Sequence, residues 1–288
     1  MKLKELIINF TPTGMIPTKE MTEHVPVSVD EIVEDVHEAC ELGISMVHLH
    51  ARDPQDGRPT WLPEIYAEMI GKIRKFAPDL VICASLSGRI FHDLDKRAAV
   101  LDLVGPLKPD MGSLTLSSLN FNKQASLNSP DVITGLASRM KERQIKPELE
   151  AFDAGMINYA KYLIKKELIL PPHYFNLILG NIACAQADLL HAGIMIRDLP
   201  PESYWSLGGI GDQQIVMNSV AISIGGGVRV GLEDNYWFDT KRTRLARNID
   251  LLERIHVIAQ ANERDIMKPA DLRQRLGLKS GYGEYGTI

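Results

Sequence analysis

Residues 174–230 contain three apolar runs, YFNLIL (174–179), YWSL (204–207) and VRV (228–230), and this stretch decides the fold. Segments with helical character at 185–192 and 213–224 separate the runs. The links between them are short and rich in glycine, as in Gly208-Gly209-Ile210-Gly211. Alternation of strand and helix through short links indicates a parallel sheet built from β-α units.

The same alternation extends over the whole chain in about eight units. We expect strands at 6–10, 46–50, 80–85, 111–114, 148–152, 174–179, 204–207 and 228–230. We expect helices at 28–42, 63–76, 93–103, 131–143, 156–166, 185–192, 213–224 and 243–261. Eight units in 288 residues favour a closed (β/α)8 TIM barrel over a doubly wound sheet. No linker interrupts them, so we expect a single domain over residues 1–288, with a short C-terminal helical extension at 269–276.

Composition limits the classes of function. The chain is 45% hydrophobic and 24% charged, with a net charge of −5 and no block of Lys or Arg, which argues against a nucleic-acid partner. The three cysteines, Cys40, Cys83 and Cys184, form no C-x-x-C motif and are expected as reduced core thiols. The first nine residues are too short and too charged for a signal peptide, and no apolar run reaches the roughly 18 residues that span a bilayer. We therefore expect a cytoplasmic protein with no membrane partner.

A barrel of this kind carries its active site at the carboxyl ends of the strands. Many of the polar residues fall there: Thr13, His48, His50, Ser87, Ser113, Thr115, Glu150, Asp153, Asn181, Arg229, Glu233 and Asp234. Residues separated by more than 200 positions are thus expected to converge, which favours an enzyme.

His48 and His50 are two residues apart on a strand, so their side chains face the same side. Two imidazoles on one face, with Glu233 as a third ligand, form a plausible metal site with an open coordination position. Asp53 could orient a histidine or the local loop from behind. The alternative is a pair of histidines with only structural hydrogen bonds.

Other polar groups suggest an acid–base centre. Arg229 is expected to lower the pKa of Asp234, keep it ionised and attract an anionic ligand, although the two could instead form a structural ion pair. Whether Asp234 is then basic enough to take a carbon-bound proton depends on its desolvation, which the sequence does not show. The stretch from Ser85 to Arg89 can offer hydroxyl and backbone donors to a carboxylate or enolate, or can be a plain turn. Glu148 and Glu150 share one strand face, and at least one should point into the barrel mouth, unless both form interior ion pairs.

Five stretches resemble a known family. They are NFTPTGMIPTK (9–19), VHLHARD (47–53), ELEAFDAG (148–155), WSLGGIG (205–211) and VRVGLEDN (228–235). Together and in this order they resemble the β-keto acid cleavage enzymes, whose first described member cleaves 3-keto-5-aminohexanoate. The resemblance implies a zinc-dependent (β/α)8 barrel, usually a homotetramer. It implies condensation of a β-keto acid with acetyl-CoA to give acetoacetate and an acyl-CoA.

The resemblance also implies roles for individual positions. His48, His50 and Glu233 match the zinc ligands, which another divalent first-row metal could also use. Arg229 and Asp234 match the pair that generates the acetyl-CoA nucleophile. The family has a serine at the end of its third strand, which corresponds to Ser87, with Ser85 and Gly88 beside it. Its hydroxyl residue on the fourth strand corresponds to Ser113 or Thr115, and its glutamate on the fifth strand to Glu150 or Glu148. The substrate loop comprises Thr13, Gly14, Met15 and Ile16.

Some positions depart from the family pattern. The aminohexanoate enzyme has a glutamate in the strand-one loop, where this chain has Gly14-Met15-Ile16, so a neutral or aliphatic β-keto acid is expected rather than a cationic one. Lys19 could instead meet a second carboxylate, or could simply be solvated. The paired glycines after strand three become Gly88-Arg89. The alternative functions are a CoA-independent metal-dependent aldolase or hydrolase on the same barrel and a non-catalytic ligand-binding homologue.

Overall fold

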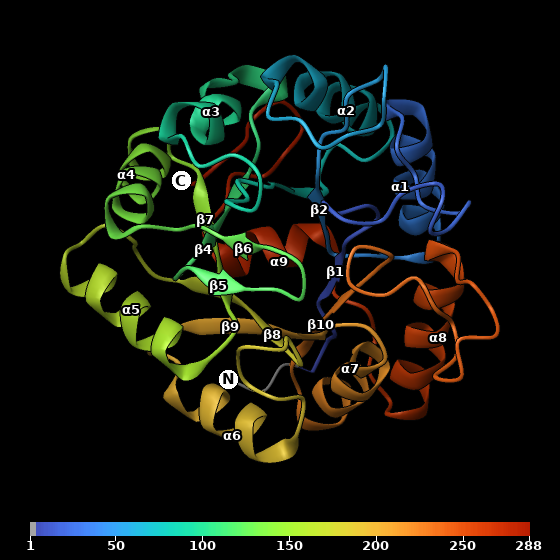
Figure 1. The fold of residues 1–288 in the computed structure, drawn as a ribbon. Coiled ribbons are helices and arrows are strands. Elements are labelled where there is room, and N and C mark those ends of the chain that lie inside the picture. The colour runs from blue at the N-terminus through green and yellow to red at the C-terminus, as the bar shows by residue number, and fades with distance from the viewer. Residues whose placement is uncertain (1–3) are drawn as a thin grey trace.

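Eight parallel strands close into a barrel in the computed structural model, which describes residues 4–288 (Figure 1). The barrel strands are β1 (Ile8–Phe10), β2 (Met46–Leu49), β3 (Val81–Ala84), β4 (Met111–Thr115), β7 (Lys146–Ala151), β8 (His173–Leu179), β9 (Ser203–Gly209) and β10 (Gly227–Val230). Hydrogen bonds join them in the order β1-β10-β9-β8-β7-β4-β3-β2, and β2 closes the ring onto β1. The expected (β/α)8 barrel is therefore confirmed; residues 1–3 lie outside the described part.

The long helices form a ring around this barrel (Figure 1). They are α1 (Val29–Leu42), α2 (Pro63–Phe76), α3 (Leu94–Ala98), α4 (Pro130–Glu142), α5 (Ala154–Lys165), α6 (Leu189–Asp198), α7 (Gln213–Ile224) and α8 (Asn248–Ala261). Local sequence fixes many of their ends. Ser28 and Glu31 form a capping box at the start of α1, and Pro63 occupies the first turn of α2. None of the helices in residues 4–288 has both the length and the apolar character needed to cross a bilayer.

Three expected helices have different bounds. The helix expected at 185–192 is α6, which begins at Leu189 because the Asp188 carboxylate caps it. The helix expected at 243–261 begins only at Asn248, because the Asp239 carboxylate accepts the backbone N–H groups of Thr243 and Arg244 and holds them in a turn. The helix expected at 93–103 breaks into α3 and the 3₁₀ turn η1 (Ala99–Asp102), which the 3₁₀ turn η2 (Gly105–Leu107) follows.

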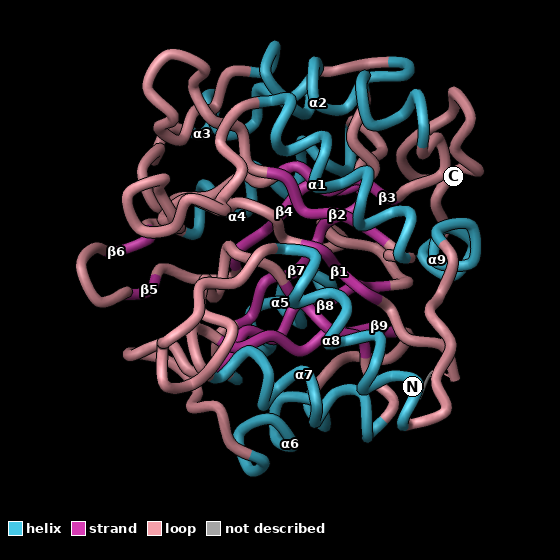
Figure 2. Tube along the Cα trace, turned by 90° about the vertical axis from the view of Figure 1, so that its right-hand side faces the viewer, coloured by secondary structure: helices cyan, strands magenta, loops and turns pink. Residues whose placement is uncertain are grey.

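The two ends of the barrel are covered differently (Figure 2). The hairpin of β5 (Leu119–Asn120) and β6 (Ala125–Ser126) projects at the end where β4 finishes. The helix α9 (Pro269–Leu276), the expected C-terminal extension, lies at the opposite end. Its Leu272 and Leu276 belong to a buried apolar cluster with barrel-interior side chains from several strands. The amino ends of the strands are thus closed, and the carboxyl ends remain available for a site.

Candidate active site and metal centre

A cavity of about 750 Å³ opens at the carboxyl ends of the strands. Its wall includes residues from the loops after nearly every strand: Met15, Ile16, His50, Ser85, Ser87, Arg89, Thr115, Phe121, Glu150, Arg229, Glu233 and Asp234. Cavities of several hundred cubic ångströms with a few convergent polar groups are typical of small-molecule sites. Many of the polar residues expected near an active site therefore line one cavity at the carboxyl ends of the strands.

His50 lines this cavity, and the buried His48 lies against His50. Their Nε2 atoms are 3.2 Å apart, and His50 Nε2 lies 3.1 Å from Oε1 of Glu233. Gly14 permits this approach, because a Cβ there would lie 2.4 Å from the Glu233 Cγ and the backbone φ is +69°. Strand β2 and the loop after β10 thus meet at one point, 183 positions apart in sequence.

Glu148 fixes the orientation of His48 by contacting the ring nitrogen that does not face His50. One of its oxygens lies 2.5 Å from His48 Nδ1 and accepts the Cys83 thiol at 3.2 Å. The other oxygen accepts the amide groups of Asn9 and Asn176, both at 2.7 Å. Although burial raises it, the charge and hydrogen bond of His48 bring the pKa of Glu148 down to about 2. The contact to Nδ1 leaves His48 Nε2 facing His50 Nε2.

The donor set at this point suits a divalent first-row metal. The ligand atoms of His48, His50 and Glu233 all lie within 4.8 Å of one another. The second oxygen of Glu233 is buried and has no hydrogen-bond partner among residues 4–288, which is costly unless another group binds there. Burial lowers the pKa of His50 to about 4, so its imidazole is a neutral donor at neutral pH. Two imidazole nitrogens and a carboxylate match the ligand preference of zinc.

His48, Cys83 and Glu148 form a second candidate set of metal ligands. It is less suitable, since both oxygens of Glu148 are already occupied by hydrogen-bond donors.

Arg229 connects the metal ligands to Asp234. Its Nε donates to Asp234 Oδ2 at 2.8 Å, and its Nη2 lies 2.7 Å from Glu233 Oε1. Burial raises the pKa of the Asp234 carboxyl above its ordinary value, although Arg229 acts to lower it. Arg229 thus lowers the pKa of Asp234 as expected, but desolvation, which the sequence leaves open, outweighs the ion pair and sets the net direction. A carboxylate with a raised pKa is a stronger base.

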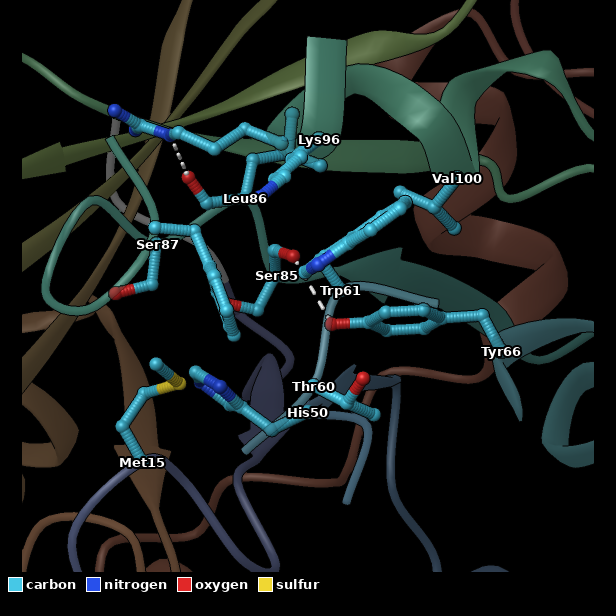
Figure 3. Close-up of a pocket in the computed structure, with 12 residues that line it drawn as sticks. Met15, His50, Thr60, Trp61, Tyr66, Ser85, Leu86, Ser87, Lys96 and Val100 are labelled. Atoms are coloured by element: carbon cyan, nitrogen blue, oxygen red, sulfur yellow. Dashed lines mark hydrogen bonds between the residues drawn. The ribbon is translucent and has the colours of Figure 1, made fainter. Parts of the chain in front are cut away.

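A third group of polar side chains lines the wall beside this centre. Thr115 Oγ1 donates to Glu150 Oε2 at 2.7 Å, and burial raises the pKa of Glu150. The Tyr66 hydroxyl donates to the backbone oxygen of Ser85 at 3.1 Å. Figure 3 shows Ser85, Ser87, His50 and Met15 around a common space. This space is a smaller pocket that adjoins the cavity, and Met15, His50, Ser85 and Ser87 line both.

The model of the β-keto acid cleavage enzyme family matches residues 5–278. The chain belongs to this family.

Characterised relatives agree over nearly their full length. The chain is 35% identical over 280 residues to the 3-keto-5-aminohexanoate cleavage enzyme of Fusobacterium nucleatum, covering 96% of this chain and 99% of the relative. It is 34% identical over 277 residues to the 3-oxoadipate:acetyl-CoA acetyltransferase of Cupriavidus necator, covering 95% of each chain. A solved structure, the binary complex of ObcA with oxaloacetate, matches with a TM-score of 0.76 at 20% identity over 88% of this chain and 67% of its own, which supports the fold.

Several residues that the family resemblance implied for the substrate do not line the cavity. Thr13 Oγ1 donates to the Pro26 oxygen, Ser113 Oγ accepts the Leu86 N–H, and Glu148 lies beneath the histidines. Gly88 packs against the Leu127 carbonyl instead, and Gly14 against Glu233.

Two further charged residues act locally and not at the substrate. Lys19 pairs with Glu31 at 2.7 Å and donates to the Glu23 oxygen, so it is committed to the start of α1 and does not line the cavity. Asp53 accepts the Gln55 N–H and so orients its own turn, which is the second of the two roles that the sequence allowed. Both are charged residues near a strand end whose nearest partners are local.

Sequence reasoning missed the polar layer beneath the histidines. Asn9, Cys83 and Asn176 all contact Glu148 and are fully buried. The sequence did contain a sign of this layer, because Asn9 and Asn176 are polar residues within otherwise apolar strands of the barrel. A buried amide is retained in such a strand only when it finds a partner.

Proposed function

We propose that this family member is a zinc-dependent β-keto acid:acetyl-CoA enzyme that releases acetoacetate and an acyl-CoA. The observation that supports it most is the convergence of His48, His50 and Glu233 beside the Arg229–Asp234 pair at the floor of one cavity. When bound, zinc would act as a Lewis acid on the oxygens of the β-keto acid. Following the family, we also propose a homotetramer that acts in the cytoplasm.

The proposed products determine which carbon becomes the nucleophile. Acetoacetate joins the acetyl group of acetyl-CoA to the C1–C2 unit of the β-keto acid, so the new bond connects C2 of that acid to the thioester carbon. The proton that Asp234 removes therefore comes from C2 of the β-keto acid. The family resemblance suggested that acetyl-CoA is the nucleophile, but that assignment does not give acetoacetate and an acyl-CoA as products.

The remaining steps conserve atoms without an oxidant. The C2 carbanion adds to the thioester carbon and the CoA thiolate leaves. The thiolate then adds to C3, the C2–C3 bond breaks, and C2 takes back the proton from Asp234. Arg229 holds the Asp234 carboxylate at 2.8 Å in the orientation for both transfers. Ser87 and Glu150, which line the same wall, are proposed to hold the substrate oxygens.

The test is acetoacetate production by purified protein with acetyl-CoA and a panel of β-keto acids, with and without a chelator. We expect chelator-sensitive product that zinc restores. Consumption of the β-keto acid without acetyl-CoA would instead support a CoA-independent aldolase or hydrolase. No turnover of any acid by metal-loaded protein would support a non-catalytic ligand-binding role.

A further inference from the structure

Arg89 is a cation in the cavity wall that pairs with no carboxylate in the described part of the chain. It lies in the loop between β3 and α3 and lines the cavity. Within residues 4–288 its guanidinium has no hydrogen-bond or ion-pair partner, and it stacks on Phe121 with its Cζ 3.5 Å from the ring centroid. The other cavity arginines are paired, Arg229 with Asp234 and Arg242 with Asp212.

The loop that carries Arg89 is held in one position. The Gly88 oxygen accepts the Leu127 N–H at 3.0 Å, and a Cβ at Gly88 would lie 2.3 Å from the Leu127 oxygen. The Arg89 N–H donates to the Ser87 hydroxyl at 3.3 Å. Stacking on Phe121 uses the face of the guanidinium and leaves the N–H groups at its edge free to donate. The side chain is thus oriented as a donor toward the cavity.

The surroundings make this cation a strong site for an added anion. Burial lowers the pKa of Arg89, while the carboxylates of Glu233, Asp234 and Glu150 act to raise it. Those carboxylates are themselves bound, by Arg229 and by Thr115. Arg89 therefore interacts electrostatically with these carboxylates but does not contact them. A desolvated guanidinium of this kind can form two short hydrogen bonds with the carboxylate of a ligand.

We propose that Arg89 binds a distal carboxylate of the substrate, so that this enzyme prefers β-keto dicarboxylic acids. The inference rests on the proposed function. The first carboxylate and the keto group would lie at the histidines and Glu233. The second would reach Arg89 across the apolar wall of Met15 and Ile16, which suits a short methylene chain. This revises the expectation of a neutral acid and gives Arg89 the role that the sequence suggested for Lys19.

The phosphates of CoA are the other anions that enter this cavity. They are separated from the thioester by the whole pantetheine arm. Arg89, whose charge interacts with the carboxylates Glu233, Asp234 and Glu150, is therefore too close to the thioester to contact the CoA phosphates. Lys123, exposed on the β5–β6 hairpin at the cavity rim, is better placed for phosphate.

The experiment compares two acids of equal chain length, 3-oxohexanedioate and 3-oxohexanoate. Binding of each to zinc-loaded protein is measured by calorimetry without acetyl-CoA, and kcat/KM is measured with acetyl-CoA. The variants are Arg89→Met, which removes the charge, and Arg89→Lys, which keeps it. Arg58→Met is the matched control, because the Arg58 side chain is 83% exposed and lies outside the cavity wall.

We expect the native protein to bind the dicarboxylate about 10- to 100-fold more tightly than the monocarboxylate. Arg89→Met should abolish that preference and leave the monocarboxylate and the KM for acetyl-CoA unchanged, while Arg89→Lys retains part of it and Arg58→Met all of it. Equal losses for both acids, an unchanged preference in Arg89→Met, or a change confined to the acetyl-CoA KM would overturn the proposal. Failure of every acid to give acetoacetate would instead remove the proposed function, and the binding preference would still decide the role of Arg89.

Discussion

The Nδ1 atom of His48 lies 2.5 Å from Oε2 of Glu148, and neither side chain is more than 1% exposed. This contact directs His48 Nε2 toward His50. Carboxylates that orient metal-binding histidines in this way typically change metal affinity 10- to 100-fold, by about 1.4 to 2.7 kcal/mol.

Glu148→Gln should therefore weaken zinc binding by about 10- to 100-fold, because an amide is a weaker acceptor than a carboxylate for the histidine N–H. Competition against a chromophoric chelator measures the affinity. Glu150→Gln is the matched control, since Glu150 lines the cavity and hydrogen bonds to Thr115 rather than to a histidine. Native-like zinc affinity in a folded Glu148→Gln protein would show that the contact does not orient the ligand.

Asp234→Asn should retain zinc and lose turnover by about 10²- to 10⁴-fold, because the amide keeps the contact with Arg229 but cannot accept a proton from C2. Metal content and single-turnover acetoacetate formation measure the two effects separately. If kcat stays within a few-fold of the native value, Asp234 is not the base.

The fold could be predicted from sequence because each β-α unit carries its own apolar run and its own link. The pair His48 and His50 could be predicted because strand side chains alternate with a period of two. The direction of an isolated side chain at a strand end could not be. Thr13 and Ser113 stand where substrate residues were expected, yet both bond to backbone groups of neighbouring loops. The net pKa shift of Asp234 also depends on burial, which only the folded structure determines.

The closed end of the barrel depends on a buried ion pair. Arg273 of α9 donates to both oxygens of Asp110, at 3.0 and 2.7 Å, and to the backbone oxygens of Asp79 and Leu80. Arg273→Met leaves the Asp110 carboxylate without its main partner, so we expect the free energy of unfolding to fall by about 3 to 5 kcal/mol. Urea denaturation measures this.

A neighbouring arginine supplies the control for that change. Arg275 pairs with Glu5 on the surface, where both side chains are 35% exposed, and Arg275→Met should cost less than about 1 kcal/mol. Similar losses in the two variants would contradict the role given to the buried pair. Because α9 lies at the opposite end from the cavity, we expect both folded variants to keep native kcat.

The stability of the protein should depend on pH through Asp35 on α1. Burial raises the pKa of Asp35 from 3.8 to about 6, although its Oδ2 accepts the Asn248 amide at 2.6 Å. The folded state therefore binds this proton more tightly than the unfolded state does. Its contribution is fully present below pH 3.8 and is lost as the pH rises through about 6.

Asp35→Asn removes this dependence and keeps an oxygen that can accept the Asn248 amide. Relative to the native protein, the variant should be more stable by about 3 kcal/mol at pH 7.5, and the difference should shrink toward zero near pH 4. Denaturation at a series of pH values measures the difference, and Glu34→Gln, an exposed position on the same helix, controls for the loss of one carboxylate. A difference that is constant across this range, or that grows as the pH falls, would show that Asp35 is not held in its protonated form by burial.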